Sequence, residues 1–459
     1  MSDHPTADPA RPTGCAPDRD SPQTPTRRRK DFVVAVASAQ TQAATSTKAP
    51  YTTRVIELCY CRRIETCPLV QYAVSAPVMH IDFIASIHAV SATEWNALCA
   101  TDYPFIRHEF FAALEDSNST TLARGWQPHH LIMRDKGVVM AALPLFIKHH
   151  SYGEYVFDWA WADAWQRYGF AYYPKVVSAI PFTPCYGTRL LVSQHTTTRA
   201  VLPGLVEHLQ QHIVQQGFSS WHCLFPVEEL KDQLSDMGIR PRLGCQFHWF
   251  NNDYKNFSDF LARMSSRKRK NILKERRHVQ EQGFTFEWKQ GAAITAADWD
   301  FFAELYQLTY LKRSGHGGYL QRDFFHLLGK NLPEHTLLII ARHQGSPVAA
   351  ALYLYDSSTL YGRYWGCREE FDFLHFETCY YQGIDFAIAQ GLQRFDGGAQ
   401  GEHKIQRGFE PVATWSNHWV ATEDFRPAID RFLAEERHSV THYLSAAREH
   451  LPFKNNDPR

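Results

Sequence analysis

The sequence has no excess of either charge, because lysine and arginine together number 48 and so do aspartate and glutamate. This balance excludes the global basicity of proteins that bind nucleic acid or anionic membranes over their whole surface, so any basic site has to be local. The sequence also lacks an apolar run near the roughly 20 residues that a transmembrane helix needs. Without a membrane span or a convincing signal peptide, we expect a soluble, cytoplasmic protein.

The ten cysteines form no regular framework. Their scatter over 459 residues is typical of reduced thiols in a cytoplasmic protein rather than of a disulfide scaffold. One cluster, Cys59, Cys61 and Cys67, offers three thiols at irregular spacing without a nearby fourth ligand. Structural zinc sites are almost always four-coordinate, and we therefore predict no metal site.

Two motifs are also missing. The sequence contains no Gly-x-Gly-x-x-Gly or Walker-type loop, which argues against a nucleotide-cofactor enzyme and predicts no permanently bound cofactor. A Gly-x-Ser-x-Gly elbow is absent as well, which weakens a hydrolase interpretation.

The length of 459 residues exceeds what one hydrophobic core usually supports, so two domains are expected. The first fifty residues are rich in Pro, Thr, Ala, Asp and Arg and cannot bury enough apolar surface to become ordered. Regular patterning begins at Met79. We predict that residues 1–78 are a disordered or non-native extension, and that the folded chain starts at Met79.

After Met79 the same order of predicted strands and helices occurs twice, in residues 79–255 and in residues 284–425. Such repetition predicts two copies of one α/β module. A basic connecting helix is expected between them over residues 256–283, and a C-terminal helix and tail over residues 426–459. The main elements expected are helices over 201–216, 228–237, 297–309, 322–328 and 376–392, and strands over 220–225, 245–250, 284–290, 394–396 and 415–420.

The connecting helix carries a dense cationic band. Its members at the helix start are Arg267, Lys268, Arg269 and Lys270. One interpretation is a solvated helix face, as most charge runs are. The other is a clamp for a phosphate-bearing donor, because Arg and Lys at a helix start combine positive charge with free backbone donors.

The stretch from Phe371 to Trp419 is where we expect the chemistry. It places the densest set of ionisable side chains between two elements that are predicted to be buried. His375 and Glu377 stand at the start of its helix, and either would accept a proton from an attacking amine. For Glu377 the alternative is a helix N-terminal carboxylate that the macrodipole favours.

A glycine-rich turn follows in the same stretch. Its polar residues are Gln400, Glu402, His403, Lys404 and Arg407. The turn is either an exposed polar loop or a buried network. In the second case Glu402 or His403 is the proton acceptor, Lys404 or Arg407 binds a carboxylate or phosphate, and Gln400 contacts the substrate.

An aromatic insertion in the first half, residues 153–191, interleaves polar side chains with tryptophans. Asp158, Tyr173 and Lys175 lie among Trp159 and Trp161. Aromatic rings around a few polar groups are typical of a recognition pocket, so these three are predicted to bind substrate. The alternative is a long loop that packs its own aromatics against the domain.

Six motifs carry a family resemblance that covers roughly Met79 to Val420. They are GEYVFDWAWADAW, YYPK, PFTPCYG, SSRKRKNILKERR, HFETCYYQGIDFAI and GAQGEHKIQRGFEPV. Together they resemble the FemAB-like family of predicted N-acyltransferases in the GNAT superfamily. The resemblance implies a tandem GNAT-like α/β fold of mixed sheets flanked by helices, with acyl transfer in the cleft of the second module. It also implies kinship with enzymes that add amino acids to peptidoglycan precursors from aminoacyl-tRNA.

The sequence departs from the superfamily in one place. The pyrophosphate loop, Arg/Gln-x-x-Gly-x-Gly/Ala, is not visible between Trp365 and Phe376. Acyl-CoA and aminoacyl-tRNA therefore both stay open as co-substrates, with a primary amine as acceptor. Two alternatives to a FemAB-like transferase are a non-catalytic GNAT-like protein that binds RNA or another polyanion, and an acetyl-CoA-dependent acetyltransferase of a small amine or protein lysine.

Overall fold

The computed structural model describes residues 79–399 and 401–454. The predicted N-terminal extension, the cluster at Cys59, Cys61 and Cys67, and Gln400 lie outside the described residues. The first described element, β1, begins at Met79, the residue at which regular patterning starts in the sequence.

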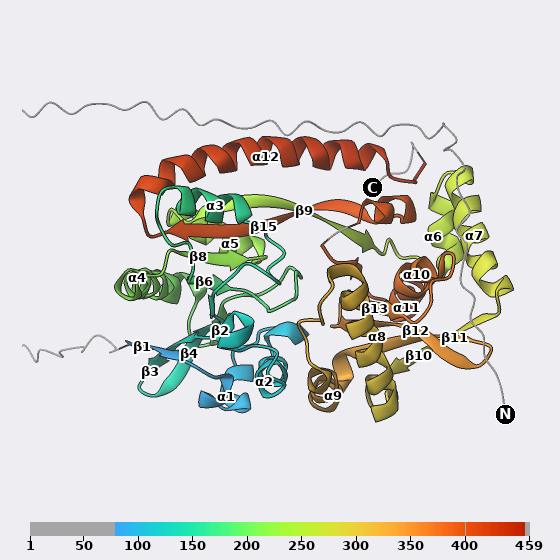
Figure 1. The fold of residues 1–459 in the computed structure, drawn as a ribbon, viewed down its shortest axis with the longest axis horizontal. Helices are drawn as coiled ribbons and strands as arrows, with labels where there is room; N and C mark the ends of the chain where they lie inside the picture. Colours follow the sequence, from blue (N-terminus) through green and yellow to red (C-terminus); the bar gives the residue numbers. More distant parts are fainter. Residues whose placement is uncertain (1–78, 400, 455–459) are drawn as a thin grey trace, which may run out of the picture. The chain divides into compact units, whose positions relative to one another are not determined.

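The strands form two sheets, one of four strands and one of eleven. Most neighbouring strands are antiparallel, and Figure 1 shows the larger sheet continuing through both halves of the chain. In spatial order the smaller sheet contains β1 (Met79–Ile84), β3 (His130–Asp135), β4 (Val138–Leu143) and β7 (Leu191–Val192). The larger contains β10 (Phe284–Gln290), β11 (Thr336–His343), β12 (Ser346–Tyr355), β13 (Thr359–Cys367), β14 (Arg394–Asp396), β9 (Arg240–Phe250), β15 (Glu410–Val420), β8 (Ser220–Leu224), β6 (Lys175–Ser178), β5 (Phe146–Lys148) and β2 (Trp126–Pro128).

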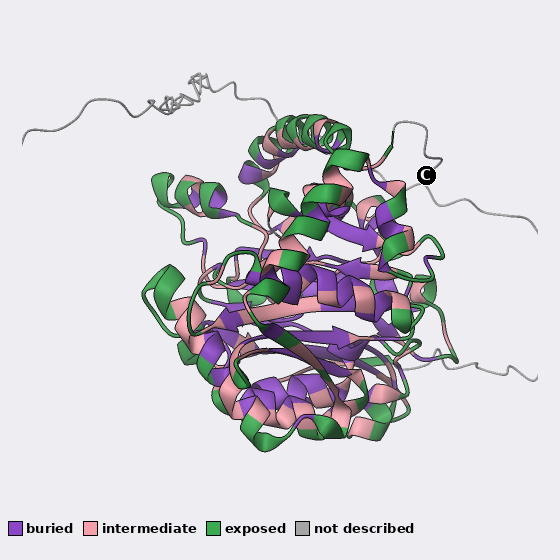
Figure 2. Cartoon of the chain, turned by 90° about the vertical axis from the view of Figure 1, so that its right-hand side faces the viewer, coloured by how far each residue is buried: buried purple, intermediate pink, exposed green. Residues whose placement is uncertain are grey.

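Helices cover both sheets, and their outer faces are exposed while the sheet itself is buried (Figure 2). Several begin at side-chain caps that the sequence supplies, such as the reciprocal capping box of Thr295 and Asp298 at α8. The helices are α1 (Ala92–Asn96), α2 (His108–Asp116), α3 (Trp159–Arg167), α4 (Thr198–Gln216), α5 (Glu228–Asp236), α6 (Phe257–Arg263), α7 (Ser266–Glu281), α8 (Ala296–Ser314), α9 (Arg322–Asn331), α10 (Leu374–Phe376), α11 (Gln382–Ala389) and α12 (Arg426–Glu449).

The two halves exchange strands at the centre of the larger sheet. Strand β15 of the second half lies between β8 and β9 of the first, and β9 lies between β15 and β14. The pairing of β9 with β15 is antiparallel and runs from Glu410 opposite His248 to His418 opposite Arg240. The two predicted modules therefore share one continuous sheet, and one apolar cluster contains residues of both, including Trp95 and Phe302.

Each half contains one parallel strand pair in an otherwise antiparallel sheet. In the first half β6 runs parallel to β8, and in the second β13 runs parallel to β14. A helical crossover joins each pair, as parallel neighbours require. This repeated arrangement confirms the expected tandem GNAT-like α/β fold.

Two segments differ from the sequence-based expectation. The connecting helix is two helices, α6 and α7, because the chain becomes extended at Met264 (φ −79°, ψ 155°) before α7 begins at Ser266. The aromatic insertion contains α3 and β6 rather than one long loop, since Trp161 and Trp165 give it a buried helical face. None of the helices in the described ranges is long and apolar enough to cross a membrane.

Candidate active site

The parallel pair β13 and β14 separates after a short contact. Only Thr359, Leu360 and Tyr361 of β13 face partners on β14. From Gly362 onward β13 pairs only with β12, on its other edge. Strand β14 pairs with β9 on the edge that faces away from β13. This divergence leaves one edge of β13 without a neighbouring strand and opens a cleft between the two strands.

A widened turn of helix lines this cleft. Residues Glu377–Tyr381 form a π-helical turn between α10 and α11. The Tyr353 hydroxyl donates a hydrogen bond to the Thr378 carbonyl at 2.6 Å, and so satisfies a backbone acceptor within the turn. Single π-helical turns inside α-helices occur frequently at functional sites. Here the turn places Cys379 and Tyr380 on the wall of the cleft.

An inner cavity of about 110 Å³ occupies the divergence. Its walls come from four elements: β12, the free part of β13, the π-helical turn with α10, and the end of β14. Its lining residues are Ala351, Leu352, Tyr353, Gly362, Arg363, Tyr364, Trp365, His375, Cys379, Tyr380, Phe395 and Gly397.

Tyr380 and His403 form a hydrogen-bonded pair at this cavity, with the Tyr380 hydroxyl 2.9 Å from Nε2 of His403. The His375 ring lies beside both, with its centroid 5.4 Å from that of Tyr380 and 6.0 Å from that of His403. Three groups able to move a proton thus meet at one place, supplied by the helix after β13 and by the turn after β14.

The surroundings keep both imidazoles neutral at physiological pH. Partial burial of the His403 ring, followed by the positive charges of Lys404 and Arg407, lowers the pKa of His403 to about 4. Burial and the neighbouring His403 lower the pKa of His375 to about 3. The pKa of Tyr380 is raised by burial, so its hydroxyl keeps its proton. The site therefore presents two uncharged imidazoles and one protonated phenol.

The family model described as peptidoglycan biosynthesis/recognition, FemAB-like, matches residues 86–455. The chain belongs to the FemAB-like family. None of the curated proteins compared with this FemAB-like chain matches it in sequence.

Solved structures similar to this FemAB-like protein share little sequence with it. FemX is 12% identical, and the match covers 72% of this chain and 96% of FemX at a TM-score of 0.45. A tandem GNAT protein from the clavulanic acid biosynthesis pathway is 10% identical, with coverage of 75% and 99% and a TM-score of 0.42. L-PGS from Bacillus licheniformis is 12% identical, with coverage of 73% and 96% and a TM-score of 0.43.

The predicted residues of the glycine-rich turn point in different directions and contact different elements. Both Glu402 and His403 are exposed. The His403 ring contacts Tyr380 and Phe376 beside the cleft, whereas Glu402 accepts a hydrogen bond from Tyr443 of α12 at 2.8 Å. Lys404 is buried, and its Nζ donates to the Gly398 carbonyl at 2.9 Å. Burial lowers the Lys404 pKa to about 8, although the Asp396 carboxylate opposes this change.

Two further predicted residues are held by ion pairs with α7. Arg407 lies 3.0 Å from the Glu275 carboxylate and covers the face of Phe376. Glu377 is buried and lies 2.9 Å from Arg276, which also contacts Asp385. These pairs fix the cleft helix and the turn against α7. They favour the structural interpretation of Glu377 over the catalytic one.

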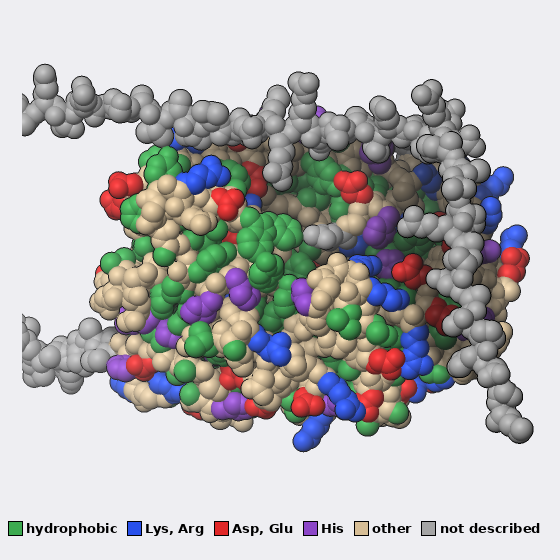
Figure 3. Space-filling model, in the orientation of Figure 1, with side chains coloured by type: hydrophobic (Ala, Val, Ile, Leu, Met, Phe, Trp, Pro, Cys, Tyr) green, Lys and Arg blue, Asp and Glu red, His purple; other side chains and the backbone are tan. Residues whose placement is uncertain are grey.

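The cationic band of this FemAB-like protein lies on the outer side of α7. Lys268 donates a hydrogen bond to Gln406 of the turn. Four other basic side chains form a stripe along α7 that is exposed and makes no ion pair with a described residue. This stripe, which we call the basic stripe, consists of Arg267, Lys270, Lys274 and Arg277. Figure 3 shows lysine and arginine side chains at the edge where Figure 1 places α7.

The structure brings Asp158, Lys175 and Tyr173 together in the first half, but inside the protein. The Lys175 ammonium is fully buried and bonds to Asp158 and, at 2.9 Å, to Glu154. Its third contact is the Ser151 hydroxyl at 2.9 Å, which is also bonded to the Tyr173 hydroxyl. The inner cavity is not lined by any residue of this network, and the role of the network in substrate binding stays a prediction.

One set of potential metal ligands belongs to the same network. Ligand atoms of Glu154, Asp158 and His222 lie within 4.8 Å of one another. The Lys175 ammonium contacts both carboxylates and therefore already supplies the positive charge that a cation would bring.

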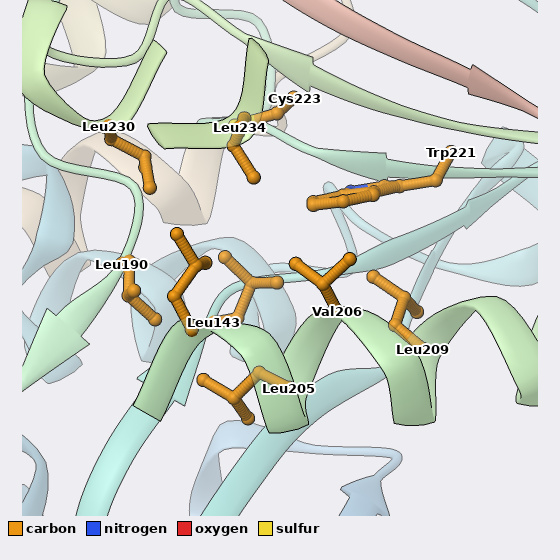
Figure 4. Close-up of a pocket in the computed structure, with 10 residues that line it drawn as sticks. Leu143, Leu190, Leu205, Val206, Leu209, Trp221, Cys223, Leu230 and Leu234 are labelled. Carbon is orange, nitrogen blue, oxygen red and sulfur yellow. The ribbon is translucent and has the colours of Figure 1, made fainter. Parts of the chain in front are cut away.

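The first half also holds a small apolar cavity of about 10 Å³. Figure 4 shows Val206 and Leu209 of α4 facing Trp221 of β8 across it. A space of this size holds at most about one water-sized probe, and a ligand site needs hundreds of cubic ångströms. It is a packing gap under α4.

Sequence reasoning missed Tyr380. The signal present in the sequence is its spacing from His375, since the two are five residues apart and a π-helical turn repeats at that interval. It also missed the contribution of α8, whose Lys312 and Arg313 line a second cavity next to the first.

Proposed function

We propose that this protein is an N-acyltransferase that moves an acyl or aminoacyl group from an activated donor to a primary amine in the cleft between β13 and β14. The observation that carries the proposal is the inner cavity, which is lined by His375, by Tyr380 and by the unpaired part of β13, and at which Tyr380 is hydrogen-bonded to His403. Membership of the FemAB-like family supports the same reaction class.

In the proposed reaction, the amine nitrogen attacks the donor carbonyl carbon, and the carbonyl oxygen becomes an oxyanion. Backbone N–H groups along the free edge of β13 stabilise that oxyanion, as preorganised donors do in acyl transfer. His375 takes the proton that the amine loses. A developing negative charge beside an imidazole raises its pKa, so a group that is neutral in the resting site becomes a base when needed.

The leaving group then departs with a proton from the Tyr380 hydroxyl. His403 orients this hydroxyl. The proton that His375 took from the amine restores it afterwards, since the His375 ring lies beside both Tyr380 and His403, and all three groups return to their resting state. General acid and base groups contribute roughly 10²–10⁴-fold to such steps. The protein also holds the donor and acceptor together in the cleft, which supplies a further part of the acceleration.

For the donor we propose an aminoacyl-tRNA rather than acyl-CoA. The connection from β13 to α10 carries Glu369, Glu370 and Asp372, whose negative charges oppose a pyrophosphate. The basic stripe lies on the helix that is anchored to the cleft through Glu275 and Arg276, and cationic stripes of this kind bind nucleic acid phosphates.

The test uses the full chain with hydroxylamine as a small nucleophilic amine and two donors, alanyl-tRNA and acetyl-CoA. Formation of alanyl hydroxamate above the uncatalysed rate supports the proposal. Acetyl hydroxamate alone would replace the proposed donor by acetyl-CoA. Tight alanyl-tRNA binding without any hydroxamate would instead support the non-catalytic binding protein.

A further inference from the structure

A second, larger cavity of about 380 Å³ adjoins the inner one. The two share Trp365 and His375, whose ring centroids are 5.4 Å apart. We call the second space the outer cavity. It is lined by Thr309, Lys312, Arg313, Trp365, Cys367, Glu369, Glu370, Phe371, Leu374 and His375.

The charges around the outer cavity balance in sign. Lys312 and Arg313 come from the end of α8, and Glu369 and Glu370 come from the connection after β13. His375 is uncharged, because its pKa is lowered to about 3. The lining therefore carries two cations and two anions, and all four side chains are exposed.

The four charged side chains of the outer cavity do not form ion pairs with one another. The adjacent Arg368 is paired with Glu304 at 3.0 Å, and Lys312 donates to the Arg368 carbonyl at 3.4 Å. In contrast, Arg313, Glu369 and Glu370 make no ion pair or hydrogen bond with any described residue. Both signs are thus available to a ligand in the same cavity.

Such a lining selects against ligands of a single charge. A phosphate or carboxylate alone meets two glutamates, and an ammonium alone meets a lysine and an arginine, so each has a repulsive neighbour. A dipolar group with an ammonium and a carboxylate satisfies both pairs. Trp365, Phe371 and Leu374 offer apolar surface for the carbon chain that such a group carries.

We propose that the outer cavity binds the zwitterionic end of the acceptor, and that the acceptor is a diamino acid or carries a diamino acid end. The ammonium lies at Glu369 and Glu370, the carboxylate lies at Lys312 and Arg313, and the second amine passes Trp365 and His375 into the inner cavity. This inference rests on the proposed function, because it assigns the acceptor of that same reaction.

The reaction forms one bond, breaks one bond and transfers one proton. A C–N bond forms between the second amine and the donor carbonyl carbon, and the ester C–O bond of the aminoacyl donor breaks. The amine loses one proton, and the departing ribose oxygen gains one. The zwitterionic end takes no part in the chemistry, and the product is an amide that keeps its ammonium and carboxylate.

Isothermal titration of the full chain tests the proposal without any donor. L-lysine is the probe, and three analogues each lack one charge: Nα-acetyl-L-lysine, L-lysinamide and 1,5-diaminopentane. We expect L-lysine to bind at least tenfold more tightly than each analogue. Equal binding of the four compounds, or no binding of L-lysine at millimolar concentration, overturns the proposal.

Paired variants locate the binding. Glu369→Gln with Glu370→Gln should remove the preference for L-lysine over Nα-acetyl-L-lysine, and Lys312→Gln with Arg313→Gln should remove the preference over L-lysinamide. Arg322→Gln, an exposed arginine paired with Asp300 on the neighbouring helix, is the matched control and should change neither ratio. Unchanged ratios in both double variants also overturn the proposal.

The two proposals fail separately. Hydroxamate formation reports the transferase activity and needs no amino acid end on the nucleophile, whereas L-lysine titration reports the outer cavity and needs no turnover. Hydroxamate formation without selective L-lysine binding therefore removes only the assignment of the acceptor. Selective L-lysine binding without hydroxamate removes the reaction, and it leaves the outer cavity as a site for a zwitterion that is not an acceptor.

Discussion

The Tyr380 hydroxyl lies 2.9 Å from Nε2 of His403, although the two residues come from different elements on opposite sides of β14 in the sequence. The strand brings the helix before it and the turn after it to the same side of the cleft. Because the imidazole is neutral and the phenol protonated, the pair is prepared to donate a proton rather than to bind an anion.

Replacing Tyr380 by phenylalanine removes this donor and keeps the ring. We expect hydroxamate formation to fall by about 10²-fold or more, because one general acid is lost. The apolar packing of the ring is kept, so the thermal unfolding midpoint should change little. Tyr443→Phe removes another hydroxyl outside the cleft and should leave the rate unchanged. Wild-type activity in Tyr380→Phe would refute the role given to this residue.

The neighbouring Glu402 and His403 should behave differently from each other. Glu402 faces Tyr443 of α12, so Glu402→Gln is expected to retain most of the activity. His403→Asn loses the partner of Tyr380, and we expect a loss of about 10-fold to 100-fold in kcat with a smaller change in KM. The same assay on both variants decides which residue of the turn serves the reaction, and a larger loss in Glu402→Gln contradicts the assignment.

The sequence predicted most of the helices and strands around this site, but it did not predict which of their side chains face the cleft. Strand β14 occurs at residues 394–396 as predicted, since its buried Phe395 and the following glycines are local signals. Tyr380 was not recognised because the π-helical turn depends on Tyr353 of another strand. Which of two adjacent side chains, Glu402 or His403, faces the cleft depends on α12, which lies much later in the sequence.

The aromatic insertion illustrates a second limit. Sequence reasoning found that Asp158, Tyr173 and Lys175 belong together, because polar residues among tryptophans indicate a shared environment. It did not show that the network is buried inside the protein. Complete burial of Lys175 follows from the pairing of β6 with β8 and β5, which is a long-range property of the sheet.

Lys175→Met should therefore be strongly destabilising. The variant leaves the buried carboxylates of Glu154 and Asp158 without their cation, and removing one partner of a buried ion pair typically costs about 3–5 kcal/mol. Urea unfolding measures the loss, with the exposed Lys330→Met as control. A stability within about 1 kcal/mol of wild type would show that the network does not depend on this charge.

The basic stripe predicts the salt dependence of donor binding. Lys270→Ala with Arg277→Ala removes two exposed cations of α7 and keeps the anchoring pairs of Glu275 and Arg276. We expect weaker alanyl-tRNA binding and a slope of log K against log salt that is shallower by about one to two. Lys330→Ala is the control, since this exposed lysine lies on α9. An unchanged slope would exclude the stripe as a phosphate contact.

His403 gives a prediction for the stability at acid pH. Its pKa is lowered from 6.5 to about 4 in the folded protein, so between these values the unfolded chain binds a proton that the folded chain does not. The free energy of unfolding should therefore fall as the pH drops from 6.5 to 4. His403→Asn removes this group, and its stability should fall less steeply over the same range than that of the wild type. Urea titrations at several pH values measure both curves, and parallel curves would mean that His403 titrates normally in the cleft and is not held neutral beside Tyr380.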